Sequence, residues 1–125
     1  MDNTAILNGF TIKGGYADYA GGGIYNTGVL SGSSPEITNC IITDNKTGQG
    51  GNGAGIYNEA SSSPRFTNCI ISYNITDGNG GGIYNINASP KLINCTVAQN
   101  KAGYGSGMFN DVGSSPVIYL SLIHI

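Results

Sequence analysis

The chain has 125 residues, of which 21 are glycine and 10% are charged, and its formal net charge at pH 7 is −2. This sparse and slightly acidic charge argues against a basic surface for nucleic acid or for an anionic membrane. No apolar run reaches the roughly 18 residues that a membrane-spanning helix needs, and the glycines lack the strict third-position period of collagen.

One unit recurs along nearly the whole sequence. Its prolines are spaced 29, 26 and 26 residues apart, and its cysteines are spaced 29 and 26 residues apart. The glycine before each Ile-Tyr-Asn-like box recurs at 32, 27 and 25 residues. Because the spacings of these different residues change together along the chain, they indicate one structural unit with loops of variable length. The markers are Pro35, Pro64, Pro90, Pro116, Cys40, Cys69, Cys95, Gly23, Gly55, Gly82 and Gly107.

The first copy, within residues 7–12, is degenerate. It fits the repeat when Gly9 takes the slot of Asn39 and Phe10 takes the slot of Cys40. Glycine and asparagine are the residues that best tolerate left-handed backbone angles. We therefore expect a bend between two short strands at this slot, with asparagine side chains stacked from copy to copy. The stacked residues would be Asn39, Asn68 and Asn94.

The residues after each proline alternate between charged and apolar, as expected of a strand with one buried face. Glu36, Arg65 and Lys91 are predicted to face water. Ile37, Phe66 and Leu92 are predicted to face inward, and so are the first and third residues of each Cys-Ile-Ile-like triplet. Further asparagines are expected to close the first strand (Asn26, Asn58, Asn85, Asn110) and the third strand (Asn45, Asn74, Asn100).

Each copy thus holds three short strands and three bends in about 25–32 residues. Copies stacked in register would form parallel sheets with strands ~4.8 Å apart. A lone coil buries too little to fold, so burial against neighbouring coils must stabilise it. The sequence predicts an all-β parallel β-helix of about four to five coils over residues 1–119.

Two kinds of box carry a family resemblance. The first is Gly21–Ile24, Gly53–Ile56, Gly80–Ile83 and Gly105–Met108, and the second is Ile42–Asn45, Ile71–Asn74 and Val97–Asn100. They resemble the Gly-Gly-Ala-Ile and Phe-x-x-Asn boxes of right-handed parallel β-helix proteins, specifically the polymorphic outer membrane protein repeat, with aliphatics in place of phenylalanine. The resemblance covers residues 5–119. It implies a right-handed helix and an adhesin-like role on the bacterial outer cell surface or in secreted, extracellular form.

Both ends of the chain depart from the repeat. Residues 120–125 read Leu-Ser-Leu-Ile-His-Ile where asparagine is due. Their back-translation CTG TCT CTT ATA CAC ATC is similar to the mosaic-end adapter of transposase-based sequencing libraries. We interpret these residues, including His124, as not native; the alternative is an apolar terminal strand. Residues 1–3 do not resemble a signal peptide and the chain starts within a coil, so we expect further coils on either side.

Enzymes on this fold that cleave polysaccharides need clustered carboxylates. None of the carboxylates is expected to stack on another, so no catalytic residue is predicted: they are Asp2, Asp18, Asp44, Asp77, Asp111, Glu36 and Glu59. Residues 50–56 resemble a calcium-binding glycine repeat, but Gly55 stands where that repeat needs aspartate. No metal and no cofactor is therefore predicted. Cys40, Cys69 and Cys95 are interpreted as buried thiols, although stacked Cα atoms ~4.8 Å apart would also allow a disulfide.

One aromatic residue follows the inward Ile or Met of each box. Tyr25, Tyr57, Tyr84 and Phe109 should therefore face outward on one strand and form an exposed ladder. Such a ladder could hold a glycan or a host or cell-surface protein, or it could only stabilise the sheet, which we favour. The loops 46–53, 75–80 and 101–106 compete with the ladder as the recognition surface.

The leading hypothesis is a non-enzymatic fragment of a secreted or cell-surface adhesin-like β-helix protein that acts as a binding scaffold. It would contact no nucleic acid and would not insert into a membrane. The alternative is part of a carbohydrate-active enzyme, of the polysaccharide lyase or glycosidase kind, whose catalytic coils lie outside this segment.

The interpretation of residues 120–125 predicts the genomic sequence. Amplifying this locus from the source material should give a codon for asparagine or glycine near position 120. Recovery of the Leu-Ser-Leu-Ile-His-Ile codons from independent genomic DNA would show that the tail is native.

Overall fold

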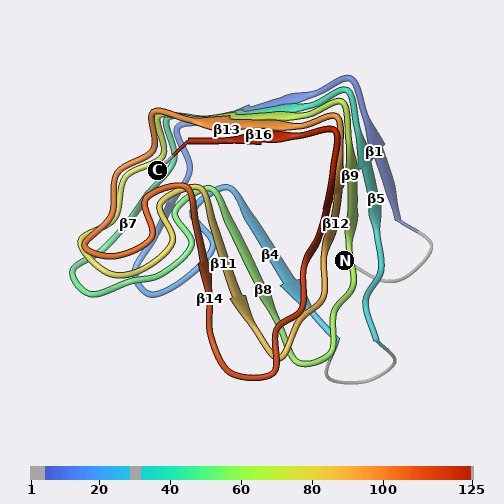
Figure 1. Ribbon diagram of the computed structural model, residues 1–125. Coiled ribbons are helices and arrows are strands. Elements are labelled where there is room, and N and C mark those ends of the chain that lie inside the picture. Colours follow the sequence, from blue (N-terminus) through green and yellow to red (C-terminus); the bar gives the residue numbers. More distant parts are fainter. Residues whose placement is uncertain (1–4, 29–31, 125) are drawn as a thin grey trace.

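The computed structural model describes residues 5–28 and 32–124. The chain winds into a parallel β-solenoid of about four turns (Figure 1). Each strand pairs with the equivalent strand of the next turn, so every named pair is parallel. The all-β parallel β-helix predicted from the repeat is confirmed. Asp2 and Ile125, which entered the sequence interpretation, lie outside the described residues.

Three sheets enclose the core, and a smaller one flanks them. The first sheet contains β1 (Ile6–Asn8), β5 (Glu36–Thr38), β9 (Arg65–Thr67), β12 (Lys91–Ile93) and β15 (Val117–Tyr119). The second contains β2 (Thr11–Lys13), β6 (Ile41–Thr43), β10 (Ile70–Ser72), β13 (Thr96–Ala98) and β16 (Leu122–Ile123). The third contains β4 (Ile24–Thr27), β8 (Ile56–Glu59), β11 (Ile83–Ile86) and β14 (Met108–Asn110). The small sheet pairs β3 (Tyr16–Ala17) with β7 (Lys46–Thr47), and single bridges continue it through Ile75 to Lys101.

The core consists of aliphatic and aromatic ladders from the three sheets. Ile37 pairs in register with Phe66, and Phe66 with Leu92, and all three side chains are fully buried, as predicted. In the second sheet Ile42, Ile71 and Val97 are buried, whereas Ile41 and Ile70 face solvent. The alternation inferred from the Cys-Ile-Ile-like triplets is therefore confirmed.

The degenerate first copy has the predicted register but not the predicted burial of Phe10. Ile6 pairs with Glu36, and the N–H of Ile41 donates to the carbonyl of Phe10 at 2.9 Å, which places Phe10 opposite Cys40. Phe10 is nevertheless 57% exposed, while Cys40 is buried. Cys40 has described coils on both sides and Phe10 on one side only, which accounts for the difference.

The glycine boxes combine a special backbone angle with a close approach between coils. Gly53 has a φ of 61°, which favours a residue without a side chain. Two residues on, a Cβ on Gly55 would lie 2.6 Å from the carbonyl oxygen of Gly82 in the next coil. Any larger residue at position 55 would push two coils apart. The box glycines therefore serve both a left-handed turn and close packing between coils.

The asparagines form three ladders. Asn39, Asn68 and Asn94 have φ between 50° and 54° at the bend between strands. They stack as predicted, with Asn94 donating to Asn68 and Asn68 donating to Asn39. Asn39 donates to Asn8, because its own equivalent in the preceding coil is Gly9. The prediction that a second set closes the first strand holds only for Asn110, the last residue of β14, and is wrong for the other three. Asn26, Asn58 and Asn85 lie inside strands of the third sheet with fully buried side chains, joined by amide hydrogen bonds of 2.8 Å. Asn58 and Asn85 can be buried there because each accepts from one neighbouring amide and donates to the next. The Oδ1 of Asn26, at the end of the described row, is buried without a hydrogen-bond partner among the described residues.

The third asparagine ladder ties side chains to the backbone. Asn74 is fully buried, and its Nδ2 donates to the carbonyl of Ile42 and to Oδ1 of Asn100, both at 3.0 Å. Its own Oδ1 accepts the backbone N–H of Asn45 at 3.1 Å and the Nδ2 of Asn45 at 3.0 Å. One side chain thus connects three coils and satisfies backbone groups that the bend leaves without a ladder partner.

The tail follows the path of the coil. Leu122 and Ile123 pair with β13, and Ile123 packs against the core. Leu120 takes the slot of Asn94 with a φ of 48° and is 81% exposed. A left-handed angle costs an ordinary residue roughly 1–2 kcal/mol, so leucine is a poor occupant of this slot. That the tail is not native stays a prediction.

The Asn74 side chain should be essential to stability. In Asn74→Ala the N–H of Asn45 and the carbonyl of Ile42 lose their partner inside the protein, and each buried unsatisfied group costs ~1–3 kcal/mol. We expect urea unfolding to show a loss of about 3 kcal/mol or more. Asn68→Gly is the matched control, because it keeps the left-handed angle and loses only exposed hydrogen bonds. Equal losses for the two variants would contradict the role of the buried ladder.

Candidate functional site

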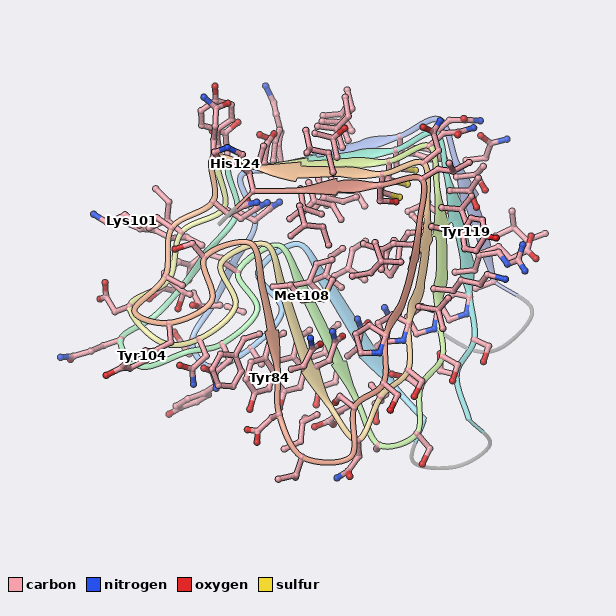
Figure 2. All side chains as sticks on the ribbon, in the orientation of Figure 1. Tyr84, Lys101, Tyr104, Met108, Tyr119 and His124 are labelled. Carbon is pink, nitrogen blue, oxygen red and sulfur yellow. The ribbon has the colours of Figure 1, made fainter. Side chains whose placement is uncertain are left out.

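The aromatic ladder lies on the outer face of the third sheet. Tyr25, Tyr57, Tyr84 and Phe109 are in register. Their ring centroids lie 5.1, 5.1 and 5.6 Å apart with interplanar angles of 8°, 13° and 3°. Figure 2 shows Tyr84 on the outside of this sheet, opposite Met108, which points into the helix. The stack exists as the sequence predicts.

The prediction that the whole ladder is exposed is wrong. Tyr25 is 43% exposed, whereas Tyr84 is only 4% exposed. Since the rings stack face to face, each ring covers the face of its neighbour. A sugar ring therefore cannot lie flat along the ladder. Tyr25 presents more surface than Tyr84 does, because it ends the described stack and has a ring on one side only.

Carboxylates hold the hydroxyl ends of the ladder. The Tyr25 hydroxyl donates to Glu59, and the Tyr84 hydroxyl donates to Oδ2 of Asp111 at 2.6 Å. Burial and these carboxylates raise the pKa of Tyr25 and Tyr84, and burial and Glu59 raise the pKa of Tyr57. The hydrogen bond from Tyr84 also lowers the pKa of Asp111. Glu59 and Asp111 thus fix the orientation of the rings.

A groove of about 650 Å³ lies where the ladder meets the loop after β3. Tyr25 and Tyr57 line it from the third sheet, and residues 17–20 line it from the loop together with Gly50 and Asn52. Tyr19 in that loop is 82% exposed. Asn52 is fixed in place, because its Oδ1 accepts the N–H of Asn79 at 2.8 Å. The groove therefore offers aromatic surface and hydrogen-bonding groups, and a hydrogen bond holds the Asn52 side chain in place.

The sequence interpretation found only part of this groove. It named Tyr25 and Tyr57 through the ladder, and it named the loop that carries Asn52 as a competing surface. It missed Asp18 and Tyr19, because the loop from Gly14 to Gly22 belongs to the degenerate first copy and has no aligned equivalent. An exposed tyrosine beside an aspartate in a glycine-rich loop was the available signal.

The cysteines lie in the core, away from this groove. Cys40, Cys69 and Cys95 are buried free thiols, as predicted. The Sγ of Cys69 lies 3.3 Å from the carbonyl oxygen of Ile37. The hydrogen bond with Cys95, together with burial, raises the pKa of the Cys69 thiol. These thiols therefore pack as small apolar groups.

Among the described residues, no three His, Cys, Asp or Glu side chains are placed so that they could hold a metal ion. Nor does the described part of the chain contain a helix with the length and apolar character needed to cross a membrane.

A family model described as a right-handed β-helix region matches residues 2–123. No curated protein and no solved structure matches the chain.

The raised pKa values of the ladder tyrosines predict an alkaline loss of stability. Their ordinary pKa is 10.0, so above that pH the unfolded chain ionises while the folded ladder stays neutral. The stability they contribute should be fully present below pH 10 and should fall as the pH rises further. Urea unfolding at successive pH values measures this slope, and Tyr25→Phe with Tyr84→Phe should flatten it. An unchanged slope in that double variant would contradict the assignment.

Proposed function

Because the chain belongs to the right-handed β-helix family, we propose that it is a non-enzymatic scaffold of the adhesin-like kind that binds a saccharide in the groove beside Tyr25. We place it outside the cell, on the cell surface or in secreted form. The repeat boxes that resemble the polymorphic outer membrane protein type support this placement.

The groove carries the saccharide proposal. Its volume of about 650 Å³ lies within the ~300–1,000 Å³ typical of small-molecule sites. The rings of Tyr19 and Tyr25 supply apolar surface for the C–H face of a sugar, and Asp18 and Asn52 supply polar groups for its hydroxyls. Aromatic surface beside a few polar groups is the composition that a ligand with one apolar face and a polar rim requires.

The position of the carboxylates favours binding over bond cleavage. Glu59 and Asp111 accept hydrogen bonds from ladder tyrosines, so their role is to orient rings. Asp18 is the only carboxylate among the described residues that line the groove. Cleavage of a glycosidic bond by acid–base catalysis needs two carboxyl groups on opposite sides of that bond. The arrangement therefore supports recognition without catalysis.

The test uses an array of neutral, amino and acidic oligosaccharides, followed by titration of any that bind. We expect Tyr19→Ala and Tyr25→Ala each to weaken binding about tenfold, the equivalent of ~1.4 kcal/mol. Tyr104→Ala is the matched control: Tyr104 is 74% exposed on a loop and does not line the groove. Figure 2 shows Tyr104 at the outer end of the loop 101–106.

Tyr84→Ala separates structure from binding. The substitution removes a ring that is 4% exposed and that stacks on both Tyr57 and Phe109. It should therefore lower the free energy of unfolding by about 3 kcal/mol. The affinity of the folded protein should stay the same. The proposal fails if no oligosaccharide on the array binds, or if Tyr104→Ala and Tyr19→Ala weaken binding equally. Binding of an isolated cell-surface protein in place of any sugar would replace this proposal with a protein-docking function.

A further inference from the structure

The groove has an uneven distribution of charge. Asp18 is exposed, and no hydrogen bond or ion pair engages its carboxylate within residues 5–28 and 32–124. None of the described residues that line the groove is Lys, Arg or His. Figure 2 shows Lys101 pointing outward, away from the third sheet. A ligand in the groove therefore meets an unpaired negative charge and no compensating positive one.

The aromatic walls favour the same sign of ligand. Tyrosine rings attract a cation placed over their faces, within ~6 Å of the ring centroid. Tyr19 is 82% exposed and Tyr25 is 43% exposed, so both rings offer accessible surface beside Asp18. Glu59 adds a second negative charge at the hydroxyl end of Tyr25. A carboxylate-bearing sugar would face repulsion here, whereas an ammonium group would be attracted by Asp18 and by the rings.

From this arrangement we infer that the groove selects saccharides that carry protonated amino groups over neutral ones, and rejects saccharides that carry carboxylates. The inference rests on the proposed saccharide-binding function and specifies its ligand. Asp18 is the residue that determines the choice, and Tyr19 and Tyr25 hold the sugar ring beside it. The ligand class is an amino-sugar oligomer such as a β-linked glucosamine chain.

The experiment compares three hexasaccharides at fixed ionic strength and at a mildly acidic pH, at which the amino groups of glucosamine are protonated. They are a glucosamine hexamer, the same hexamer fully N-acetylated, and a hexagalacturonate. We expect the glucosamine hexamer to bind about fivefold more tightly than the N-acetylated one, which is the size of effect that one exposed ion pair gives. Added salt should reduce this preference, because exposed charges are screened. Hexagalacturonate should bind more weakly than either.

Two variants assign the preference to the groove. Asp18→Asn keeps the shape of the side chain and removes its charge, so it should sharply reduce the ratio between the affinities for the two glucosamine-based hexamers while the N-acetylated hexamer still binds. Asp77→Asn removes an exposed charge from another loop that does not line the groove, so it controls for the overall acidity of the chain. It should leave the preference unchanged.

The possible results test the inferred ligand preference and the proposed saccharide binding separately. Equal binding of the two glucosamine-based hexamers, or tighter binding of hexagalacturonate, would overturn the inference and leave saccharide binding intact. An equal loss of preference in Asp77→Asn and Asp18→Asn would overturn the assignment to the groove. If none of the three hexamers and no sugar on the array binds, the proposed function itself is wrong.

Discussion

The structure depends on one constraint: every coil is in register with the next. In a parallel in-register stack each side chain lies ~4.8 Å from its own equivalent. A slot is therefore stable only when its residue tolerates contact with a copy of itself or with a close relative. Asparagine satisfies this through amide-to-amide hydrogen bonds. Tyrosine satisfies it through ring stacking, and isoleucine through packing. Opposite charges also satisfy it, as at Glu36 and Arg65, whereas the next pair in that slot, Arg65 and Lys91, places two like charges side by side on the outer face.

The same constraint explains how much of the fold could be predicted from the sequence. Because each slot repeats, the intervals between Pro35, Pro64 and Pro90 revealed the register, and alternation revealed which side chains face inward. The prediction was wrong where burial depends on more than alternation. Phe10 has the predicted register, but a described coil on one side only. Asn58 looked like a strand-closing residue because asparagine is rarely buried, yet the stacked amides remove the cost of burying it.

The candidate site was harder to predict, because it lies where the repeat is interrupted. The ladder contributes Tyr25 and Tyr57 through regular slots, and these were visible in the sequence. Asp18 and Tyr19 belong to a segment whose sequence does not align with the later copies, although its backbone pairs with residues 46–52 of the next coil. No sequence periodicity therefore placed them beside the ladder. Only the folded chain brings this loop against the third sheet. A repeat pattern thus predicts the scaffold well and predicts poorly the irregular segments that give it a distinctive surface.

The asparagine ladders also have a direction. In the buried ladder from Asn26 to Asn110, each amide donates toward the next coil, whereas in the outer ladder from Asn39 to Asn94 each donates toward the preceding one. The amide dipoles within one row add head to tail, and hydrogen bonds in such a chain polarise and strengthen one another. The two rows run in opposite senses, so their dipoles oppose each other. An amide in the middle of a row is polarised from both sides, whereas an amide at the end of a row is polarised from one side only. The strength of the hydrogen bonds between two coils therefore depends on where those coils lie in the stack as well as on their sequence.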